Sequence, residues 1–527
     1  MSYDVLIVGG GSAGCVLANR LTECGALNVL LLEAGPDYTA QTMPQEIRES
    51  AFSPASHDWG YTSQPDALGI SVAIPRGKVI GGSSSVNYCF AMRARPADHD
   101  KWHALGNDGW SYEHVLPFYR RMESYAYGDD CWHGRSGPYK LDCYNWDQLE
   151  PTAAAAALAS DARGYARVRD ANAPGEPGFS RAPLSAVGGI RQSTALTYLE
   201  GARTRKNLTV RGGVEVDCVL FDGDRAIGVR LAGGEVIKAN HVILSAGTYN
   251  SPAILMRSGV GPQEHLDELG INVVKASPGV GRNLTEHPVM WNIYAAKAPG
   301  RVVSAMFQTA LSVKSDDGLV DYDLHVLPTA AVPTELMPRA FVPPADEHPT
   351  GWDFVFFVSC MQPKSRGSVR LASANPDDAP LIDLGLYKDP DDVVKVTKAL
   401  RIARELAATP PLSDLLVSEL KPGGLVSDAD LEKAVRAAPS HYNHAASTCR
   451  MGPSTDPIAV VDNHCEVHGL KNLFVVDASV MPSISRVPTN PTTILIAERV
   501  SDWLVPRFRE QLSAAKHSHE IKETAGR

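Results

Sequence analysis

The sequence predicts an α/β protein organised around a Rossmann-type domain, a fold that binds a dinucleotide. Three observations near the N-terminus predict this fold. Residues 4–8 form an apolar run that is typical of a buried parallel strand. Glycines follow in the spacing G-x-G-x-x-G and open a stretch with helical periodicity. A second apolar run, residues 28–33, ends on an acidic residue and completes a β-α-β unit.

Each residue type in this unit has a physical reason. Gly9 permits a tight turn, Gly11 lets the backbone approach a pyrophosphate, and Gly14 lets the helix and the strand pack closely. Free N–H groups at the helix N-terminus hold phosphates, and the carboxylate of Glu33 is placed to accept hydrogen bonds from ribose hydroxyls. The nucleotide contacts predicted in this unit are Gly9, Gly11, Ser12, Ala13, Gly14, Glu33 and Ala34.

Two other interpretations fit the same glycines. A turn that only packs would need no acid, so it does not explain Glu33. Residues 10–14 also match the G-x-S-x-G elbow of serine hydrolases. That elbow normally lies well inside the sheet and is followed by Asp and His, whereas these residues follow the first strand. The nucleotide interpretation is therefore favoured.

Composition narrows the class of protein. The chain of 527 residues has a net charge of −10 and no basic stripe, so it is a poor nucleic-acid binder. No apolar run approaches the roughly 18 residues that suggest a membrane-spanning helix, and no signal peptide precedes the first strand. Nine cysteines without a C-x-x-C spacing indicate reduced thiols, a cytoplasmic location and no metal site of the structural zinc type.

Two further segments combine small residues with apolar anchors. Residues 76–87 contain glycines and serines that would let a flat ring or a pyrophosphate approach the backbone. A flexible linker is the alternative, but Val79, Ile80 and Val86 anchor this segment to a core. Residues 247–261 follow an apolar strand and predict a glycine turn, a helix started by proline and a glycine exit.

These two segments resemble the two signature segments of the glucose–methanol–choline (GMC) flavin oxidoreductases. The likeness extends from residue 3 to about residue 505 and points to the choline and alcohol dehydrogenase branch. Further matching segments lie in residues 32–35, 191–199, 278–284, 364–371, 448–452 and 476–482.

The resemblance implies a Rossmann-type FAD-binding domain that is interleaved with an α+β substrate domain carrying an antiparallel sheet. The segments of the FAD-binding domain are expected to be residues 1–150, 190–290 and 440–510. Those of the substrate domain are expected to be residues 151–189 and 291–439. Residues 511–527 are expected to form a polar tail.

The resemblance also places the cofactor. Some family members tether FAD through a His directly before the Asn of the first signature segment, which is Asn87 here. Val86 stands at that place, so non-covalent FAD is predicted. Outside the β-α-β unit, the resemblance assigns to FAD the residues Arg76, Gly82, Ser83, Asn87, Val216, Asp477 and Ala478.

The implied reaction oxidises a primary alcohol to an aldehyde by hydride transfer to flavin N5, with a general base for the hydroxyl proton. The resemblance assigns this base to His444. The family's second active-site residue, a His or an Asn, is replaced by Pro488, a departure shared with pyridoxine-oxidising members. Asn490 is the fallback for that role. His441 and His444 resemble a metal pair, but no third ligand with suitable spacing is apparent.

The predicted substrate site departs from the choline-binding pattern. Choline-oxidising members have a carboxylate directly after a His-Pro pair, and this chain has Val289 there. A quaternary ammonium binds through opposite charge or an aromatic cage, so Val289 argues against choline. His325 matches a family position that lines the pocket, with an outward-facing strand His as the alternative. Tyr442 is expected to add an aromatic wall.

Three classes of function remain open. The leading one is FAD-dependent alcohol oxidation, the second is a lyase or decarboxylase on the same fold, and the third is a flavin-binding protein without catalysis. The expected partners are a small-molecule alcohol and O₂ or another electron acceptor, with a homodimer left open. Pro488 favours an aromatic or heteroaromatic primary alcohol.

Overall fold

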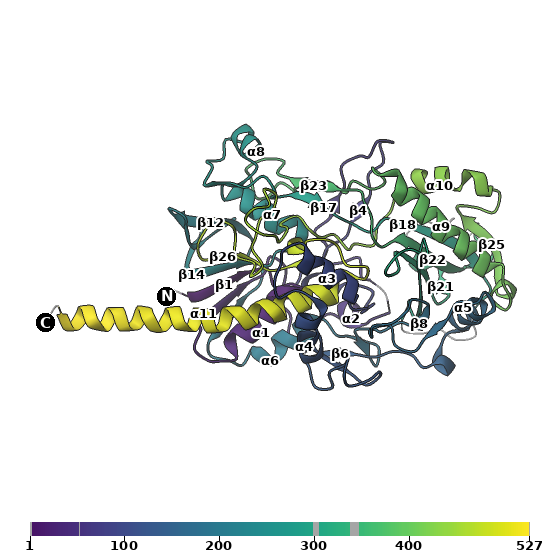
Figure 1. Ribbon diagram of the computed structural model, residues 1–527, viewed down its shortest axis with the longest axis horizontal. Coiled ribbons are helices and arrows are strands. Elements are labelled where there is room, and N and C mark those ends of the chain that lie inside the picture. Colours follow the sequence, from purple (N-terminus) through teal and green to yellow (C-terminus); the bar gives the residue numbers. More distant parts are fainter. Residues whose placement is uncertain (1–2, 52, 299–304, 338–346, 526–527) are drawn as a thin grey trace.

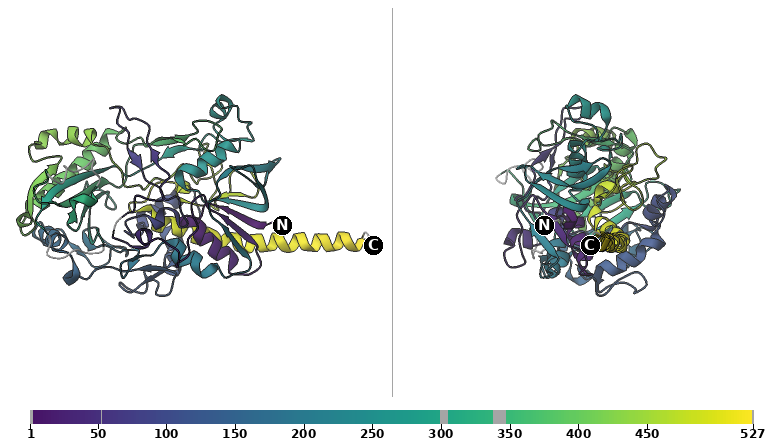
Figure 2. Two further views of the ribbon diagram at one scale, coloured as in Figure 1. Left: turned by 180° about the vertical axis from the view of Figure 1, so that it is seen from behind. Right: turned by 90° about the vertical axis from the view of Figure 1, so that its left-hand side faces the viewer.

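Two large sheets organise the chain in the computed structural model, which describes residues 3–51, 53–298, 305–337 and 347–525 (Figure 1). The sheet that contains the N-terminal strand lies in one half of an elongated molecule. The second sheet lies in the other half, and both chain termini point away from it (Figure 2).

The first sheet has seven strands in the order β11-β2-β1-β14-β13-β12, with β26 paired to β14. Strand β1 is parallel to β2 and β14, whereas β12, β13 and the first half of β14 form an antiparallel meander. The strands are β1 (Tyr3–Val8), β2 (Val29–Leu32), β11 (Leu208–Arg211), β12 (Val216–Asp222), β13 (Arg225–Leu231), β14 (Val236–Leu244) and β26 (Leu473–Val475).

The first crossover confirms the β-α-β prediction. Helix α1 (Ser12–Thr22) connects β1 to β2. A Cβ atom on Gly14 would lie 1.9 Å from the carbonyl oxygen of Gly9, so only glycine lets this helix approach the strand. Gly9 itself has a φ of 98°, a value that side chains disfavour.

The second sheet has eight strands in the order β25-β18-β22-β20-β19-β8-β7, with β21 paired to β22. All its pairings are antiparallel except that of β7 with β8. The strands are β7 (Arg167–Val168), β8 (Phe179–Arg181), β18 (Val289–Ala296), β19 (Thr309–Val313), β20 (Leu324–Pro328), β21 (Val332–Pro333), β22 (Trp352–Cys360) and β25 (Leu416–Lys421).

Helices cover this antiparallel sheet and share its apolar core, which includes Phe354 and Phe356 from β22. They are α5 (Pro151–Ala162), α9 (Pro390–Ala407) and α10 (Leu431–Ala437). Chain segments between β2 and β11 and between β14 and β26 build the second sheet. The interleaved α/β fold with an antiparallel substrate sheet is therefore confirmed, and the residue limits of the two domains stay predictions.

The remaining strands and helices lie outside these two large sheets. The small strands are β3 (Tyr61–Thr62), β4 (Ala73–Ile74), β5 (Glu123–Tyr125), β6 (Tyr139–Leu141), β9 (Ala186–Val187), β10 (Ile190–Arg191), β15 (Val260–Gly261), β16 (Lys275–Ala276), β17 (Arg282–Leu284), β23 (Gly367–Arg370) and β24 (Leu381–Asp383). The remaining α-helices are α2 (Gln45–Arg48), α3 (Pro96–Ala104), α4 (Tyr112–Met122), α6 (Glu200–Ala202), α7 (Gly247–Arg257), α8 (Gln263–Glu268) and α11 (Thr489–Ala525).

The expected polar tail is the continuation of a helix. Helix α11 begins under the first sheet, where Ile494, Leu495 and Leu504 are buried, and its last turns project away from the body (Figures 1 and 2). Residues 507–525 contain no glycine or proline that would end the helix. Within the described part of the chain, no helix is both long and apolar enough to cross a membrane.

A buried ionic cluster joins loops around β5. The guanidinium of Arg93 pairs with the carboxylate of Glu123. His133 lies between two carboxylates, with Nδ1 2.7 Å from Glu123 Oε1 and Nε2 2.7 Å from Asp170 Oδ2, and its side chain is fully buried. Burial would lower the pKa of His133, but its hydrogen bonds to Asp170 and Glu123 outweigh burial and raise it.

This cluster predicts a loss of stability at alkaline pH. Because the pKa of His133 is higher in the folded state, its contribution is complete below about pH 6.5 and declines as the pH rises through the folded value. Between pH 6 and 9, the melting temperature of the parent should fall by roughly 2 °C more than that of His133→Asn. Thermal melts across this range check it, with exposed His103→Asn as the control. Parallel curves for the parent and His133→Asn would contradict the assignment.

Candidate active site

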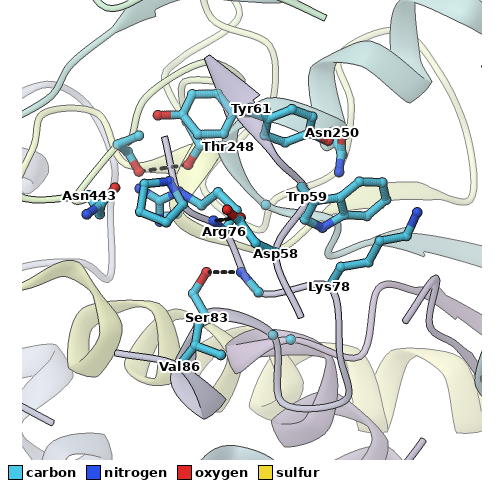
Figure 3. A pocket seen from close by; sticks show the side chains of 18 of the residues that line it. Asp58, Trp59, Tyr61, Arg76, Lys78, Ser83, Val86, Thr248, Asn250 and Asn443 are labelled. Carbon is cyan, nitrogen blue, oxygen red and sulfur yellow. Dashed lines mark hydrogen bonds between the residues drawn. The ribbon is translucent and has the colours of Figure 1, made fainter. Parts of the chain in front are cut away.

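A cavity of about 910 Å³ lies where the two sheets meet, and most of the predicted site residues line it. Figure 3 shows part of this lining, including Arg76 and Ser83. Gly14 and Val289 do not line the cavity. The predicted residues that do are Gly9, Gly11, Ser12, Ala13, Glu33, Ala34, Arg76, Gly82, Ser83, Asn87, Val216, His325, Tyr442, His444, Asp477, Ala478, Pro488 and Asn490.

At one end of the cavity, two glycine-rich loops face each other. A Cβ atom on Gly82 would lie 2.7 Å from the Cα atom of Gly11, so a side chain on Gly82 would collide with the fingerprint loop. A Cβ atom on Gly11 itself would meet only Gly82, at 3.8 Å, which leaves the backbone of the fingerprint loop open to the cavity. This end offers N–H groups without side-chain bulk, as a pyrophosphate requires.

Glu33 closes the same end from β2. Its side chain is buried and accepts hydrogen bonds of 2.8 Å from the N–H groups of Gly10 and Gly35. Burial raises the pKa of Glu33 to about 7, although the two N–H groups and the nearby Lys78 oppose this shift. Carboxylate oxygens at this position fit the ribose role predicted for it.

The carboxylate of Asp477 holds together two chain segments that line the cavity. One carboxylate oxygen accepts hydrogen bonds from Gly247 N at 2.9 Å and from Ser251 Oγ at 2.6 Å, and the other accepts from Ser479 N at 2.8 Å. These bonds join the start of α7 to the short helical turn Ala478–Val480. Asp477 therefore holds together the two segments that carry the second family motif and the motif around Ala478.

His444 lies at the other end. Its Nδ1 is 3.0 Å from Nδ1 of His287, and the two rings meet edge to face. Burial lowers the pKa of His444 well below its usual value, and the neighbouring His287 and Arg76 lower it further. The imidazole is therefore neutral near pH 7, which is the state that a proton acceptor needs.

Sequence reasoning missed the residue that holds His444 in place. The buried carboxylate of Glu286 accepts hydrogen bonds from the backbone N–H groups of His287 at 2.9 Å and His444 at 2.8 Å. Its other oxygen lies 3.3 Å from His441 Nδ1 and 3.9 Å from Arg76. Burial opposes ionisation, but His441 and Arg76 keep the pKa of Glu286 below its usual value. An acid directly before a matching His-Pro pair was the available signal.

Asn490, the fallback for the second active-site role, lines the cavity and makes side-chain hydrogen bonds within the protein. Its Oδ1 accepts a 2.7 Å hydrogen bond from Ser12 Oγ, and its Nδ2 donates to the hydroxyl of Tyr139 at 3.2 Å. Asn490 therefore ties the first turn of α11 to the fingerprint loop. Pro488 lines the cavity without a side-chain hydrogen-bonding group.

Aromatic side chains wall the cavity next to His444. Tyr442 lies 5.2 Å from His444 between ring centroids, and its hydroxyl donates to the carbonyl oxygen of Phe357. Phe357 in turn contacts Trp291 at 4.6 Å and Phe307 at 5.1 Å. Trp291 lies on β18 and Phe357 on β22, whereas Phe307 and Tyr442 lie outside the strands. Together these four residues form an apolar wall.

His325 and Val289 differ in their placement. His325 on β20 points into the cavity and stacks on Tyr322. Neither of its ring nitrogens is hydrogen-bonded to a described residue, and burial lowers its pKa to about 3. The outward-facing alternative is therefore wrong. Val289 on β18 is fully buried in an apolar cluster with Met92 and Val487. The structure does not bring Val289 to the cavity, so the prediction of a direct substrate contact is corrected.

Comparison with known proteins identifies the family. Two family models described as GMC oxidoreductase match residues 3–289 and 363–497. An oxygen-dependent choline dehydrogenase from Photobacterium profundum is 34% identical and covers 96% of this chain and 93% of its own. The mitochondrial choline dehydrogenase of Mus musculus is also 34% identical, over 95% of this chain and 89% of its own.

Solved structures share the fold. Pyridoxine 4-oxidase from Mesorbium loti superposes with a TM-score of 0.87 at 31% identity, covering 95% of this chain and 99% of its own. A fungal aryl-alcohol oxidase with a TM-score of 0.79 and 24% identity, covering 96% and 99%, shows the fold alone. These relatives are named as oxidases and dehydrogenases, so the lyase alternative finds no support.

The cavity fits the FAD that such enzymes use. Two glycine loops that face each other and Glu33 form a cradle for a dinucleotide. Arg76 also lines the cavity, and two of its buried nitrogens have no hydrogen-bond partner among the described residues. The residues that would hold FAD run from this cradle to Asp477 and Ala478, next to His444. The chain belongs to the GMC oxidoreductase family and is an FAD-dependent alcohol oxidoreductase.

Proposed function

We propose that the protein oxidises an aromatic or heteroaromatic primary alcohol to the aldehyde, with His444 as the general base. The observation that carries this proposal is the position of a neutral His444 between the glycine-lined end of one cavity and its aromatic wall. When bound, FAD supplies the acceptor for the hydride that leaves the alcohol carbon.

The surroundings of His444 support its role as base. With a proton on Nδ1, His444 donates to His287 Nδ1, and Nε2 keeps its lone pair for the alcohol proton. No hydrogen bond engages Nε2 within the described part of the chain. Glu286 fixes the backbone of His444, so the base is held in place before substrate arrives.

The walls of the cavity support an aromatic substrate. Trp291, Phe307, Phe357 and Tyr442 present ring faces and edges that stack on a flat substrate. The four residues of this wall carry no charge that would attract a cation. The solved relative named pyridoxine 4-oxidase supports a heteroaromatic alcohol, whereas the relatives named choline dehydrogenase make choline the comparison to test.

The attachment of FAD, the compartment, the electron acceptor and the oligomeric state are proposals as well. FAD is held without a covalent bond, because Val86 lines the cavity where a tethering His would stand. All nine cysteines are free, which supports a reducing compartment such as the cytoplasm. O₂ or another carrier serves as the final electron acceptor, and a homodimer stays open to a mass measurement in solution.

Removing the base tests the proposal. In His444→Ala, the rate of flavin bleaching by alcohol without oxygen should fall by about 10²–10⁴-fold. Because the pKa of His444 is lowered, the parent rate should stay flat from pH 9 down to pH 6. Stopped-flow absorbance measures both, and exposed His103→Ala is the matched control. Bleaching of His444→Ala at the parent rate would refute the assignment.

An alcohol panel tests the substrate class. Benzyl alcohol and 3-pyridinemethanol should reduce the flavin about 3- to 10-fold more efficiently than cyclohexylmethanol, which has similar size but no ring quadrupole. Choline should be slower than either aromatic alcohol. Anaerobic flavin bleaching at varied alcohol concentration gives the comparison. If choline were the fastest, the aromatic residues would be a cation cage instead.

Denaturation tests the attachment of the cofactor. When the yellow holoprotein is heated and the precipitate is removed, FAD should remain in the supernatant, because Val86 forms no bond to it. Absorbance and mass spectrometry of both fractions measure the released share. A yellow precipitate whose peptides carry flavin would show a covalent bond.

A further inference from the structure

Two antiparallel segments, residues 57–59 and 76–78, line the cavity and are called the strap below. Lys78 N donates to His57 O at 2.7 Å, and Trp59 N donates to Arg76 O at 2.9 Å. Arg76 N also donates to Asp58 Oδ1 at 2.6 Å. Asp58, Trp59, Arg76 and Lys78 all line the cavity, and Figure 3 shows Arg76 beside Asp58 and Trp59 beside Lys78.

The side chain of Lys78 connects this strap to Glu215, which lines the cavity on a different chain segment, called the opposite rim below. The ammonium group of Lys78 lies 3.3 Å from Glu215 Oε2 and 4.2 Å from the ring centroid of Trp59. Glu215 directly precedes Val216, the first residue of β12. Two residues earlier, Val214 N donates to the carbonyl oxygen of Glu33 at 2.8 Å. Glu33 is the residue assigned to the ribose, so Lys78 bridges the cavity at its adenosine end.

Both sides of this bridge are anchored. The ring of Trp59 stacks on Tyr61 at 5.7 Å, and the Tyr61 hydroxyl donates to Asn250 Oδ1 of α7 at 2.8 Å. On the opposite rim, the carbonyl oxygen of Glu215 accepts from Ala232 N at 2.9 Å. Lys78 is followed by two fully buried residues, Val79 and Ile80. The bridge therefore joins two fixed parts of the fold.

We propose that Trp59, Lys78 and Glu215 form a latch that retains FAD by closing the strap over the adenosine end of the cavity. A cofactor leaving through this end must separate Lys78 from Glu215 and Trp59. The inference rests on FAD binding and is independent of which alcohol is oxidised.

The strength of the latch follows from its exposure. The side chains of Lys78 and Glu215 are 36% and 31% exposed, and ion pairs this accessible contribute little alone. The contact of Lys78 with the Trp59 ring adds a second attraction that water screens less. We therefore expect Lys78→Met to speed FAD release by about 3- to 10-fold and Glu215→Gln by about threefold.

The experiment measures the rate of FAD release from the holoprotein as recovery of flavin fluorescence after dilution. Lys78→Met and Glu215→Gln should each release FAD faster, and the double variant no faster than Lys78→Met, because the substitutions remove one shared interaction. Lys78→Arg should release FAD at nearly the parent rate. Lys471→Met, which breaks an exposed ion pair with Asp224 elsewhere, is the matched control.

Two further readouts separate a latch from a general structural role. Added salt should speed FAD release from the parent but not from Lys78→Met. The rate of flavin reduction in FAD-saturated variants should equal that of the parent, because the latch lies away from His444. Parent-like release from both single variants, or fully additive effects in the double variant, would overturn the proposal. A salt effect of equal size in parent and Lys78→Met would do the same if other variants failed to fold.

Discussion

The approach of backbone to backbone at the glycine loops is the constraint on which the rest of the site depends. Gly14 brings helix α1 against the carbonyl of Gly9, and Gly82 brings the second loop against Gly11. A single Cβ atom at Gly14 or Gly82 would separate these segments. The cavity would then lose the cradle in which N–H groups reach a pyrophosphate.

A second, electrostatic constraint positions His444 at the other end of the same cavity. Glu286 binds the backbone N–H groups of His287 and His444 and pairs with His441, so one buried carboxylate organises three histidines. His444 stays neutral because burial and neighbouring positive groups disfavour its protonated form. Cofactor and base are thereby held in one cavity by segments that lie hundreds of residues apart in the chain.

Local sequence patterns predicted the first β-α-β unit and many of the residues of the site. The strand, the glycines and Glu33 predicted the first β-α-β unit because all of its contacts lie within about thirty residues. Most of the residues assigned through the family resemblance, including His325 and His444, line the cavity. The acid before the His-Pro pair marked Glu286, but its role was not predicted, because the backbone N–H of His444 that it binds lies 158 residues away. The surroundings of Val289 and Asn490 also depend on distant segments. The packing of β18 keeps Val289 out of the cavity, and the hydroxyl of Ser12 binds the side chain of Asn490; neither leaves a local pattern.

The most direct test of the account uses an aromatic alcohol with deuterium on its carbinol carbon. In the absence of oxygen, the flavin should be reduced more slowly by the deuterated alcohol than by the ordinary one, with one aldehyde formed per flavin reduced. This result would show that the carbon–hydrogen bond breaks as the cofactor is reduced in the cavity beside His444. Aldehyde formation while the flavin stays oxidised would contradict the account.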